Sequence, residues 1–192
     1  MLLKNLIKNS SKSLKKLNIK GLALNSKEVK KDFIFFAIKG NKFNGENYIQ
    51  EAINKGATVI VCSNSCKFKS NSVNLIKTNK IRNFLSEVTS KFYTLKPKNI
   101  IAVTGTNGKT SVAEFFYQIL SANNIPVASI GTLGIKSKTN TIKTNLTSPD
   151  TITLHKSLEK LKQNKIENVI IEASSHGLDQ NRMDHLNLKA GI

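Results

Sequence analysis

The feature that most constrains the fold is a glycine-containing turn between a strand-like apolar segment and a helical one. Ile100–Val103 reads as a short buried strand, and Ser111–Ala122 reads as a helix. The turn between them, Gly105–Thr110, has the sequence GTNGKT. A strand that passes through such a turn directly into a helix is typical of a phosphate-binding loop, because backbone N–H groups and the helix N-terminus attract phosphate. We therefore expect a nucleotide site, with Lys109 reaching the β- and γ-phosphates and the Thr110 hydroxyl binding Mg²⁺.

The spacing of this loop departs from the common nucleotide-binding pattern. In that pattern the first glycine stands five residues before the second, but this chain has Val103 there, and Gly105 stands only three residues before Gly108. An ordinary strand–turn–helix corner is the alternative. The preceding strand and the Gly-Lys-Thr sequence that follows favour the phosphate loop.

The segments after the loop alternate between strands and helices. Val127–Ile130 and Asn168–Ala173 read as strands, and Leu188–Ile192 reads as the beginning of another. Between them, Ser148 and Pro149 suit the N-cap and the first residue of a helix. This alternation indicates an α/β fold with a parallel sheet covered on both faces, as in a P-loop-type ATPase domain. The pattern stops before that domain is complete.

A smaller α/β domain precedes this sheet. Helical spacing is found in Tyr48–Gly56 and in Ile81–Val88, and four short segments rich in β-branched and aromatic residues read as strands. The proline in Thr94–Lys98 separates the two halves, so we expect domains over residues 1–96 and 97–192. The expected strands of the first domain are Ile19–Leu24, Phe33–Ile38, Thr58–Cys62 and Val73–Lys77.

A second set of polar residues follows the strand Asn168–Ala173. Glu172 stands at its C-terminal end, where α/β sheets bind their ligands, so its carboxylate can face the phosphate loop and hold Mg²⁺. A turn or helix cap is the alternative role for Glu172 by itself. In Thr144–Asp150, hydroxyl groups beside an expected helix N-terminus suit an anionic ligand, although the segment by itself reads as a capped helix start.

The histidines and cysteines show no metal-binding spacing. His176 has no Cys or His partner at the spacing of a zinc site, so we interpret it as a polar loop residue or a substrate contact. His155 and His185 belong to no motif and are interpreted as surface residues. Cys62 and Cys66 are interpreted as a strand residue and a loop residue, which indicates a reducing, cytoplasmic location.

The chain is strongly basic, with 30 Lys and Arg residues against 12 Asp and Glu and a formal net charge of +18. Nucleic-acid-binding surfaces usually use arginine, but 28 of these 30 residues are lysines and they are dispersed. We interpret the excess as surface lysine encoded by an A/T-rich genome, without nucleic-acid binding; a basic nucleic-acid-binding P-loop NTPase module is the alternative. No apolar run approaches the ~20 residues of a membrane helix, and lysines interrupt the N-terminus, which excludes a signal peptide.

Several segments together resemble the Mur ligase family, in order along essentially the whole chain. They are most similar to the branch that adds the third amino acid of the peptidoglycan peptide. Thr104–Thr110 matches the family's own shortened phosphate loop, which explains its spacing. The sequence SSHGLDQNR at residues 174–182 distinguishes this branch best from its sister ligases. The other similar segments are Leu24–Val29, Asp32–Gly40, Asn44–Gly45, Ile130–Gly134, Leu146–Asp150 and Glu172–Ala173.

The resemblance implies a set of binding residues, and Asn25 and Lys27 depart from the Asp and Arg of the family. The implied ATP contacts are Gly105, Thr106, Asn107, Gly108, Lys109 and Thr110, with Mg²⁺ at Thr110 and Glu172. The implied contacts of the UDP-sugar are Leu24, Ser26, Asn41, Lys42 and Phe43. Those of the muramoyl-peptide end are Thr147, Ser148, Ser174, Gln180 and Arg182. Catalytic roles fall to Lys109 and Glu172.

The resemblance also implies an ATP-dependent ligase that forms an amide bond in peptidoglycan synthesis. ATP would phosphorylate the D-Glu carboxylate of UDP-MurNAc-L-Ala-D-Glu, and the amine of meso-diaminopimelate or L-lysine would then displace phosphate. Such chemistry needs charge neutralisation and positioning rather than a nucleophilic side chain. The family's C-terminal domain, which selects the amino acid, has no counterpart here. We therefore expect a monomeric fragment that binds substrate but does not complete ligation alone.

Overall fold

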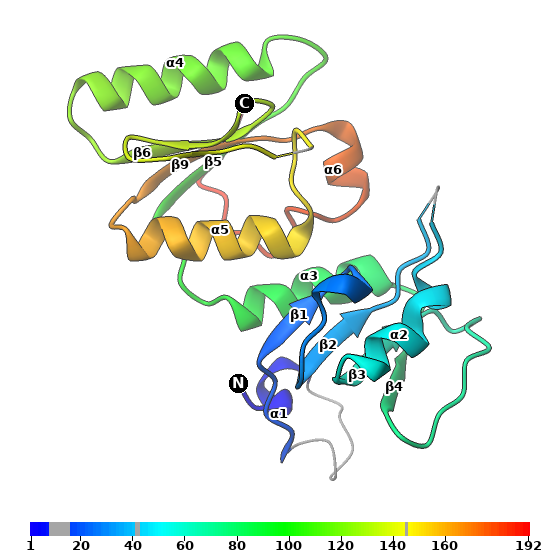
Figure 1. Cartoon of the computed structure of the whole chain (residues 1–192). Helices are drawn as coiled ribbons and strands as arrows, with labels where there is room; N and C mark the ends of the chain where they lie inside the picture. The colour runs from blue at the N-terminus through cyan, green and yellow to red at the C-terminus, as the bar shows by residue number, and fades with distance from the viewer. Residues whose placement is uncertain (8–15, 41–42, 145) are drawn as a thin grey trace. The chain divides into compact units, whose positions relative to one another are not determined.

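The computed structural model describes residues 1–7, 16–40, 43–144 and 146–192. The chain divides into two compact units, Met1–Phe92 and Tyr93–Ile192, each with its own sheet (Figure 1). Asn41 and Lys42, two of the expected substrate contacts, lie outside the described residues. Within the described ranges, no helix combines the length and the apolar character that crossing a bilayer requires.

The first unit is built on a four-stranded parallel sheet. Its strands, which are neighbours in chain order, are β1 (Gly21–Ala23), β2 (Phe33–Phe36), β3 (Ala57–Cys62) and β4 (Asn74–Lys77). Its helices are α1 (Leu3–Leu6), α2 (Ile49–Asn54) and α3 (Ile81–Phe92), with 3₁₀ turns η2 (Ser26–Glu28) and η3 (Gly45–Tyr48). Phe35 and Ile60 are buried in the core between the sheet and α2, because β-branched and aromatic side chains pack well on a pleated surface. The helix α2 is followed by Gly56 in the left-handed conformation, with φ +98°, which is a common way for a helix to end.

The second unit carries a six-stranded sheet. Its strands are β5 (Asn99–Val103), β6 (Val127–Gly131), β7 (Gly134–Ser137), β8 (Thr141–Ile142), β9 (Asn168–Glu172) and β10 (Ala190–Gly191). Their order is β10-β5-β9-β6-β7-β8. The first four strands in this order are parallel, which confirms the expected sheet. β7 and β8 extend it as an antiparallel hairpin, which the strand–helix alternation had not indicated.

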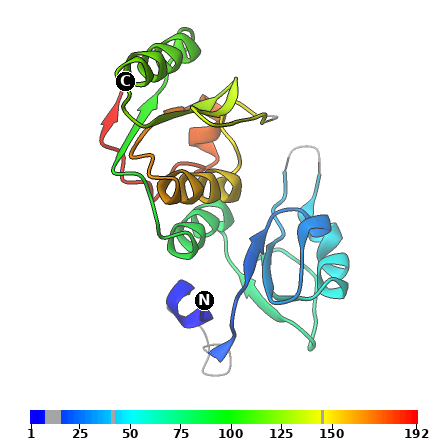
Figure 2. The ribbon, with the colours of Figure 1, turned by 60° about the vertical axis from the view of Figure 1, so that its left-hand side comes forward.

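Helices cover both faces of this second sheet, as expected. They are α4 (Lys109–Ala122), α5 (Thr151–Gln163) and the short α6 (Ser175–Asp179). Figure 1 and Figure 2 show α4 on one face and α5 on the other. Successive side chains of β9 point to opposite faces. Ile170 accordingly packs with Val103 and Ala113 of the α4 side, whereas Ile171 packs with Leu154 of α5.

The start of α5 differs from the sequence prediction. Asp150, not Ser148, is the N-cap, and its Oδ1 accepts hydrogen bonds of 3.0 Å from the backbone N–H groups of the second and third helical residues. Pro149 therefore precedes the helix instead of beginning it. Both Ser and Asp are good N-cap residues. The Ser148 hydroxyl is bonded instead to the carbonyl of Glu172, which leaves the cap to Asp150.

The interpretation of His155 as a surface residue is wrong. Its side chain is 0% exposed, and among the described residues neither ring nitrogen has a hydrogen-bond partner of ordinary geometry. His155 stands three residues before Leu158, so it shares the buried face of α5. Burial, with the charge of the nearby Lys96, lowers the pKa of His155 to about 3.

His185 and the two cysteines lie as expected, whereas the interpretation of His176 as a loop residue is wrong. His185 is exposed, and so is His176, although the latter lies in α6 rather than in a loop. Cys62 is the last residue of β3, and Cys66 lies in the loop that follows; both are buried thiols.

Candidate active site

The expected phosphate loop lies between β5 and α4 in the second unit. Gly108 is the N-cap of α4, with φ +81° and no side-chain cap. Gly105 also has a positive φ of +136°. Both conformations are ones that residues with a Cβ rarely adopt. The chain therefore passes from a strand into a helix whose first N–H groups are not capped by a side chain, which is the arrangement of an anion-binding loop.

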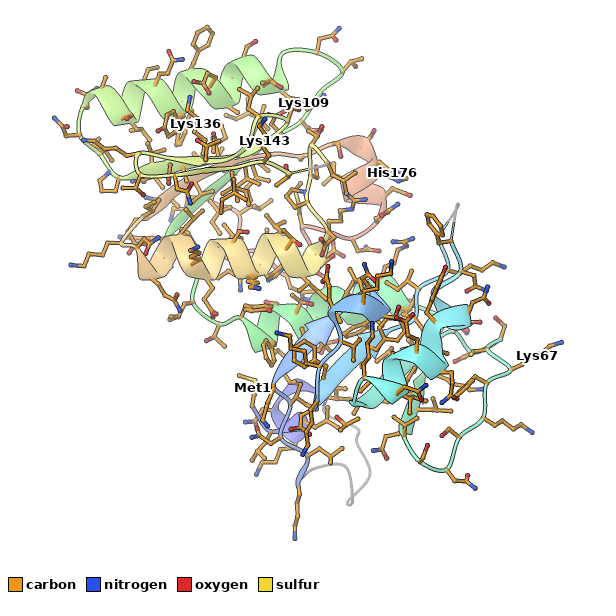
Figure 3. The ribbon with its side chains drawn as sticks, in the orientation of Figure 1. Met1, Lys67, Lys109, Lys136, Lys143 and His176 are labelled. Carbon is orange, nitrogen blue, oxygen red and sulfur yellow. The ribbon has the colours of Figure 1, made fainter. Side chains whose placement is uncertain are left out.

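Lys109 is the first residue of α4 and lies beside this loop (Figure 3). Its Nζ donates hydrogen bonds to the carbonyl oxygens of Gly105, at 2.6 Å, and Thr106, at 3.3 Å. Thr106 and Asn107 form the exposed tip of the loop. The ammonium group of Lys109 is thus held close to the backbone N–H groups with which the loop would bind phosphate.

Glu172 and Thr110, the two expected metal ligands, are in contact. Glu172 ends β9, and its side chain is buried, with 2% exposed. Its Oε2 accepts hydrogen bonds from the hydroxyls of Thr110, at 2.8 Å, and Thr132, at 3.1 Å. Its Oε1 accepts one from the backbone N–H of Thr132, at 3.0 Å. The ends of β9 and β6 and the first turn of α4 therefore meet at one carboxylate.

Gly131 makes room for that carboxylate. A Cβ on Gly131 would lie 2.0 Å from Oε1 of Glu172, far inside van der Waals contact. Any side chain at this position would displace Glu172. Neither Gly131 nor Thr132 was among the expected site residues. Their place just beyond an apolar strand, in the turn sequence GTLG, is the signal that could have indicated them.

The pair of Thr110 and Glu172 fits Mg²⁺. A hydroxyl and a carboxylate offer the hard oxygen atoms that Mg²⁺ prefers, and this ion usually takes one or two protein ligands and completes its shell with phosphate and water. No three His, Cys, Asp or Glu side chains gather into a metal cage anywhere in the described part of the chain. The donor set therefore suits a metal shared with a nucleotide rather than a closed structural site.

A hydrogen-bonded network lies behind Glu172. Ser148 is 1% exposed; its hydroxyl donates to the carbonyl of Glu172 at 2.8 Å and accepts from the backbone N–H of Ser174 at 3.0 Å. The Ser174 hydroxyl in turn caps α6 by accepting from the N–H of Gly177. Ser148 was expected to contact substrate, but its hydroxyl is enclosed and used within the protein. Thr147 reaches the site instead, with its hydroxyl 3.1 Å from that of Thr132.

Arg182 connects the same network to α6. The residue is 9% exposed, and its guanidinium donates through Nη1 to the carbonyl of Ser148 and through Nη2 to Oε1 of Gln180 at 2.9 Å. The Gln180 amide lies 2.6 Å from Nε2 of His176, which Figure 3 shows on α6. The residues expected to hold the muramoyl-peptide end thus form one cluster beside Glu172.

The remaining expected substrate contacts belong to the first unit. Ser26 begins η2 and is buried, and its hydroxyl donates to Oε2 of Glu51 at 2.7 Å. Leu24 is half-buried just before it. Phe43 is 72% exposed, so its ring is open to a ligand.

Models of known protein families match both units. Residues 18–93 match the catalytic domain of the Mur ligase family, and residues 103–192 match the Mur ligase middle domain. The chain belongs to the Mur ligase family. The resemblance drawn from the phosphate loop and the segments around Glu172 is thereby confirmed.

Curated and solved relatives of this Mur ligase chain are considerably longer than it is. The UDP-N-acetylmuramoyl-L-alanyl-D-glutamate–2,6-diaminopimelate ligase of Brucella melitensis biotype 1 is 37% identical over 175 residues, or 91% of this chain and 36% of that protein. A solved structure of a ligase with the same name has a TM-score of 0.82 at 23% identity and covers 100% of this chain and 39% of its own. The MurF ligase of Thermotoga maritima, solved with ADP, has a TM-score of 0.56 at 25% identity, over 81% and 32% of the two chains. The chain spans about a third of the length of the curated relatives it matches.

Proposed function

We propose that this chain forms the UDP-sugar-binding and ATP-binding parts of a UDP-N-acetylmuramoyl-tripeptide synthetase. The ligase would join a third amino acid to UDP-MurNAc-L-Ala-D-Glu, and the names of the curated relatives favour diaminopimelate over L-lysine. The observation that carries the proposal is the contact between Thr110 and Glu172 beside the phosphate loop. Because the chain spans about a third of those relatives, we assign complete ligation to a polypeptide of their length.

In this proposal the phosphate loop binds and orients ATP. The choice of ATP is supported by the structure of a related ligase that was solved in complex with ADP. Backbone N–H groups at the start of α4 attract the phosphate oxygens. When ATP binds, the ammonium group of Lys109 gives up its hydrogen bonds to the carbonyl oxygens of Gly105 and Thr106 and binds the β- and γ-phosphates instead. Mg²⁺ held by Thr110 and Glu172 would neutralise the charge of the transferring phosphoryl group.

The cluster beside α6 would position the acceptor. Thr147, Ser174 and Gln180 would contact the peptide end of the UDP-sugar, while Ser148 and Arg182 fix the backbone from behind. The D-Glu carboxylate attacks the γ-phosphorus, which releases ADP and leaves an acyl phosphate. The incoming amine then attacks the acyl carbon, and phosphate leaves as the amide forms. Positioning and charge neutralisation suffice, so no side chain acts as a nucleophile.

Thermal-shift measurements with the 192-residue chain test the substrate assignment. UDP-MurNAc-L-Ala-D-Glu should raise the unfolding midpoint more than UDP-MurNAc, and both more than UDP-glucose. Phe43→Ala should weaken this response, because the exposed ring contributes no buried packing to the fold. Leu95→Ala removes another exposed apolar side chain and should leave the response unchanged. Equal responses to UDP-glucose and to the dipeptide substrate would contradict the proposal.

Four further properties belong to this proposal. A ligase of UDP-linked precursors and ATP would work in the cytoplasm, and its product would affect cell shape and division through the cell wall. We also infer that the protein is a monomer. We infer that it binds no nucleic acid, since only two of the 30 cationic residues are arginines. Light scattering and salt-dependent DNA titration check these two points.

A further inference from the structure

A cavity of about 570 Å³ opens at the edge of the second sheet opposite the phosphate loop. Its walls are the end of α4, the start of β6, the β7–β8 turn and the turn from α5 into β9, which lie away from α6 in Figure 1. Pockets for small molecules usually measure about 300–1,000 Å³. None of the residues that line this cavity belongs to the ligase site described above.

Two of the walls are the C-terminal ends of α4 and α5, which have the same backbone conformation. At the end of α4, Asn124 is left-handed, with φ 56°, and the N–H of Ile125 bonds to the carbonyl five residues earlier at 2.9 Å. At the end of α5, Lys165 is left-handed, with φ 62°, and the N–H of Ile166 makes the equivalent bond at 3.0 Å. These are Schellman turns. Because β6 and β9 are neighbouring strands, the two turns place an isoleucine each at the same edge of the sheet.

The charge of the cavity is positive. Lys138 and Lys165 line it, no Asp or Glu does, and neither lysine forms an ion pair within the described residues. Glu167, the acid next along the chain, is paired with Lys162. The C-termini of α4 and α5 oppose an anion, but each contributes only about half a negative charge. Two full positive charges outweigh them.

The backbone at Lys165 costs free energy that its side chain could recover. The left-handed conformation brings the Cβ of most residues close to the following carbonyl oxygen, a strain that Gly and Asn largely avoid. The matching position of α4 is Asn124, in agreement with this rule. Strained residues are concentrated at binding sites. A lysine at such a position is therefore most readily explained if its charge binds a ligand.

We propose that this cavity binds a small organic anion. Its carboxylate or phosphate would pair with Lys138 and Lys165, and its apolar body would lie on Ile125, Pro126 and Ile166. Thr139, Gln163 and Asn164 add hydrogen-bonding groups around the charged end. The site is separate from the residues assigned to ATP and UDP-sugar binding, so a test of anion binding does not depend on the ligase assignment.

The test is an amide chemical-shift titration of the ¹⁵N-labelled 192-residue chain with 4-phenylbutyrate as probe. Saturable shifts are expected at residues 121–125, 127, 138–139 and 163–166. The neutral amide of the same acid should bind at least about ten-fold more weakly, because it lacks the charge that the two lysines attract. Phenyl phosphate should shift the same amides.

A matched pair of double variants controls for net charge and folding. Lys138→Gln with Lys165→Asn should abolish saturable binding; Asn tolerates the left-handed backbone, so the fold is kept. Lys156→Gln with Lys189→Asn removes two exposed lysines outside the cavity and should bind as the unsubstituted chain does. Non-saturable shifts spread over surface lysines, or equal losses in both double variants, would overturn the proposal.

Discussion

The hydroxyl of Thr110 donates a hydrogen bond of 2.8 Å to Oε2 of Glu172 and so joins the first turn of α4 to the end of β9. The two residues are 62 positions apart in the sequence. They meet because parallel strands present their C-terminal ends at one edge of the sheet, where the loop before α4 also lies. A carboxylate fixed at that place can share a metal ion with a nucleotide bound by the loop.

Gly131→Ala should disrupt this arrangement. The new Cβ would lie 2.0 Å from Oε1 of Glu172, and overpacking of this kind usually costs about 1–3 kcal/mol of unfolding free energy. Urea unfolding, followed through the amide signals of the second unit, measures the change. Gly191→Ala is the control, because no atom lies within 4 Å of a Cβ built there. Equal stability of the two variants would show that Glu172 adapts without cost.

Ser148→Ala should destabilise the turn between β9 and α6. The substitution removes the acceptor of the Ser174 N–H and a donor to the Glu172 carbonyl, and an unsatisfied buried group costs about 1–3 kcal/mol. The same urea experiment reads the loss. Ser157→Ala, on the partly exposed side of α5, should stay within about 0.5 kcal/mol of the unsubstituted chain. A change at Ser148 no larger than this would rule out the positioning role.

His155 should make the second unit less stable as the pH falls below neutrality. Its pKa is lowered from 6.5 to about 3 in the fold, by burial first and then by Lys96 and His185, against a smaller opposing effect of the Asp184 backbone. The unfolded chain therefore binds the extra proton between these values, so the stabilisation is complete above pH 6.5 and is lost toward pH 3. Between pH 7.0 and 5.5 the loss should be about 1 kcal/mol.

A comparison of variants assigns this loss to one ring. His155→Leu should flatten the pH dependence of the unfolding free energy over that interval, which lies above the range in which most carboxylates titrate. Leu158→Ile, on the same buried face of α5, removes no titratable group and should keep the slope of the unsubstituted chain. A slope that is unchanged in His155→Leu would show that another group titrates.

The contact between Thr110 and Glu172 could be anticipated from the sequence because a topological rule determines it. Strand–turn–helix and strand–carboxylate patterns identify two strand ends, and the parallel sheet brings them together. The cap of α5 could not be anticipated in the same way. Ser148 and Asp150 both suit an N-cap, and the choice depends on the Glu172 carbonyl, which lies 24 residues away in sequence.

Gly131 and His155 show the same limit. The need for glycine at 131 arises from a carboxylate on another strand, so the local turn sequence GTLG indicates a bend but not the clash. His155 belongs to no motif in the sequence. The groups that act on its ring, Lys96 and the Asp184 backbone, come from parts of the second unit that are distant from α5 in the sequence.

Binding of ATP by the 192-residue chain, measured calorimetrically with Mg²⁺ and with EDTA, tests the central claim most directly. The unsubstituted chain should bind ATP more tightly with Mg²⁺, and Glu172→Gln should weaken Mg²⁺-dependent binding at least about ten-fold, as loss of a metal-site group usually does. Glu114→Gln, which removes a carboxylate paired with Lys136, should bind as the unsubstituted chain does. Mg²⁺-dependent affinity that is unchanged in Glu172→Gln would contradict the account.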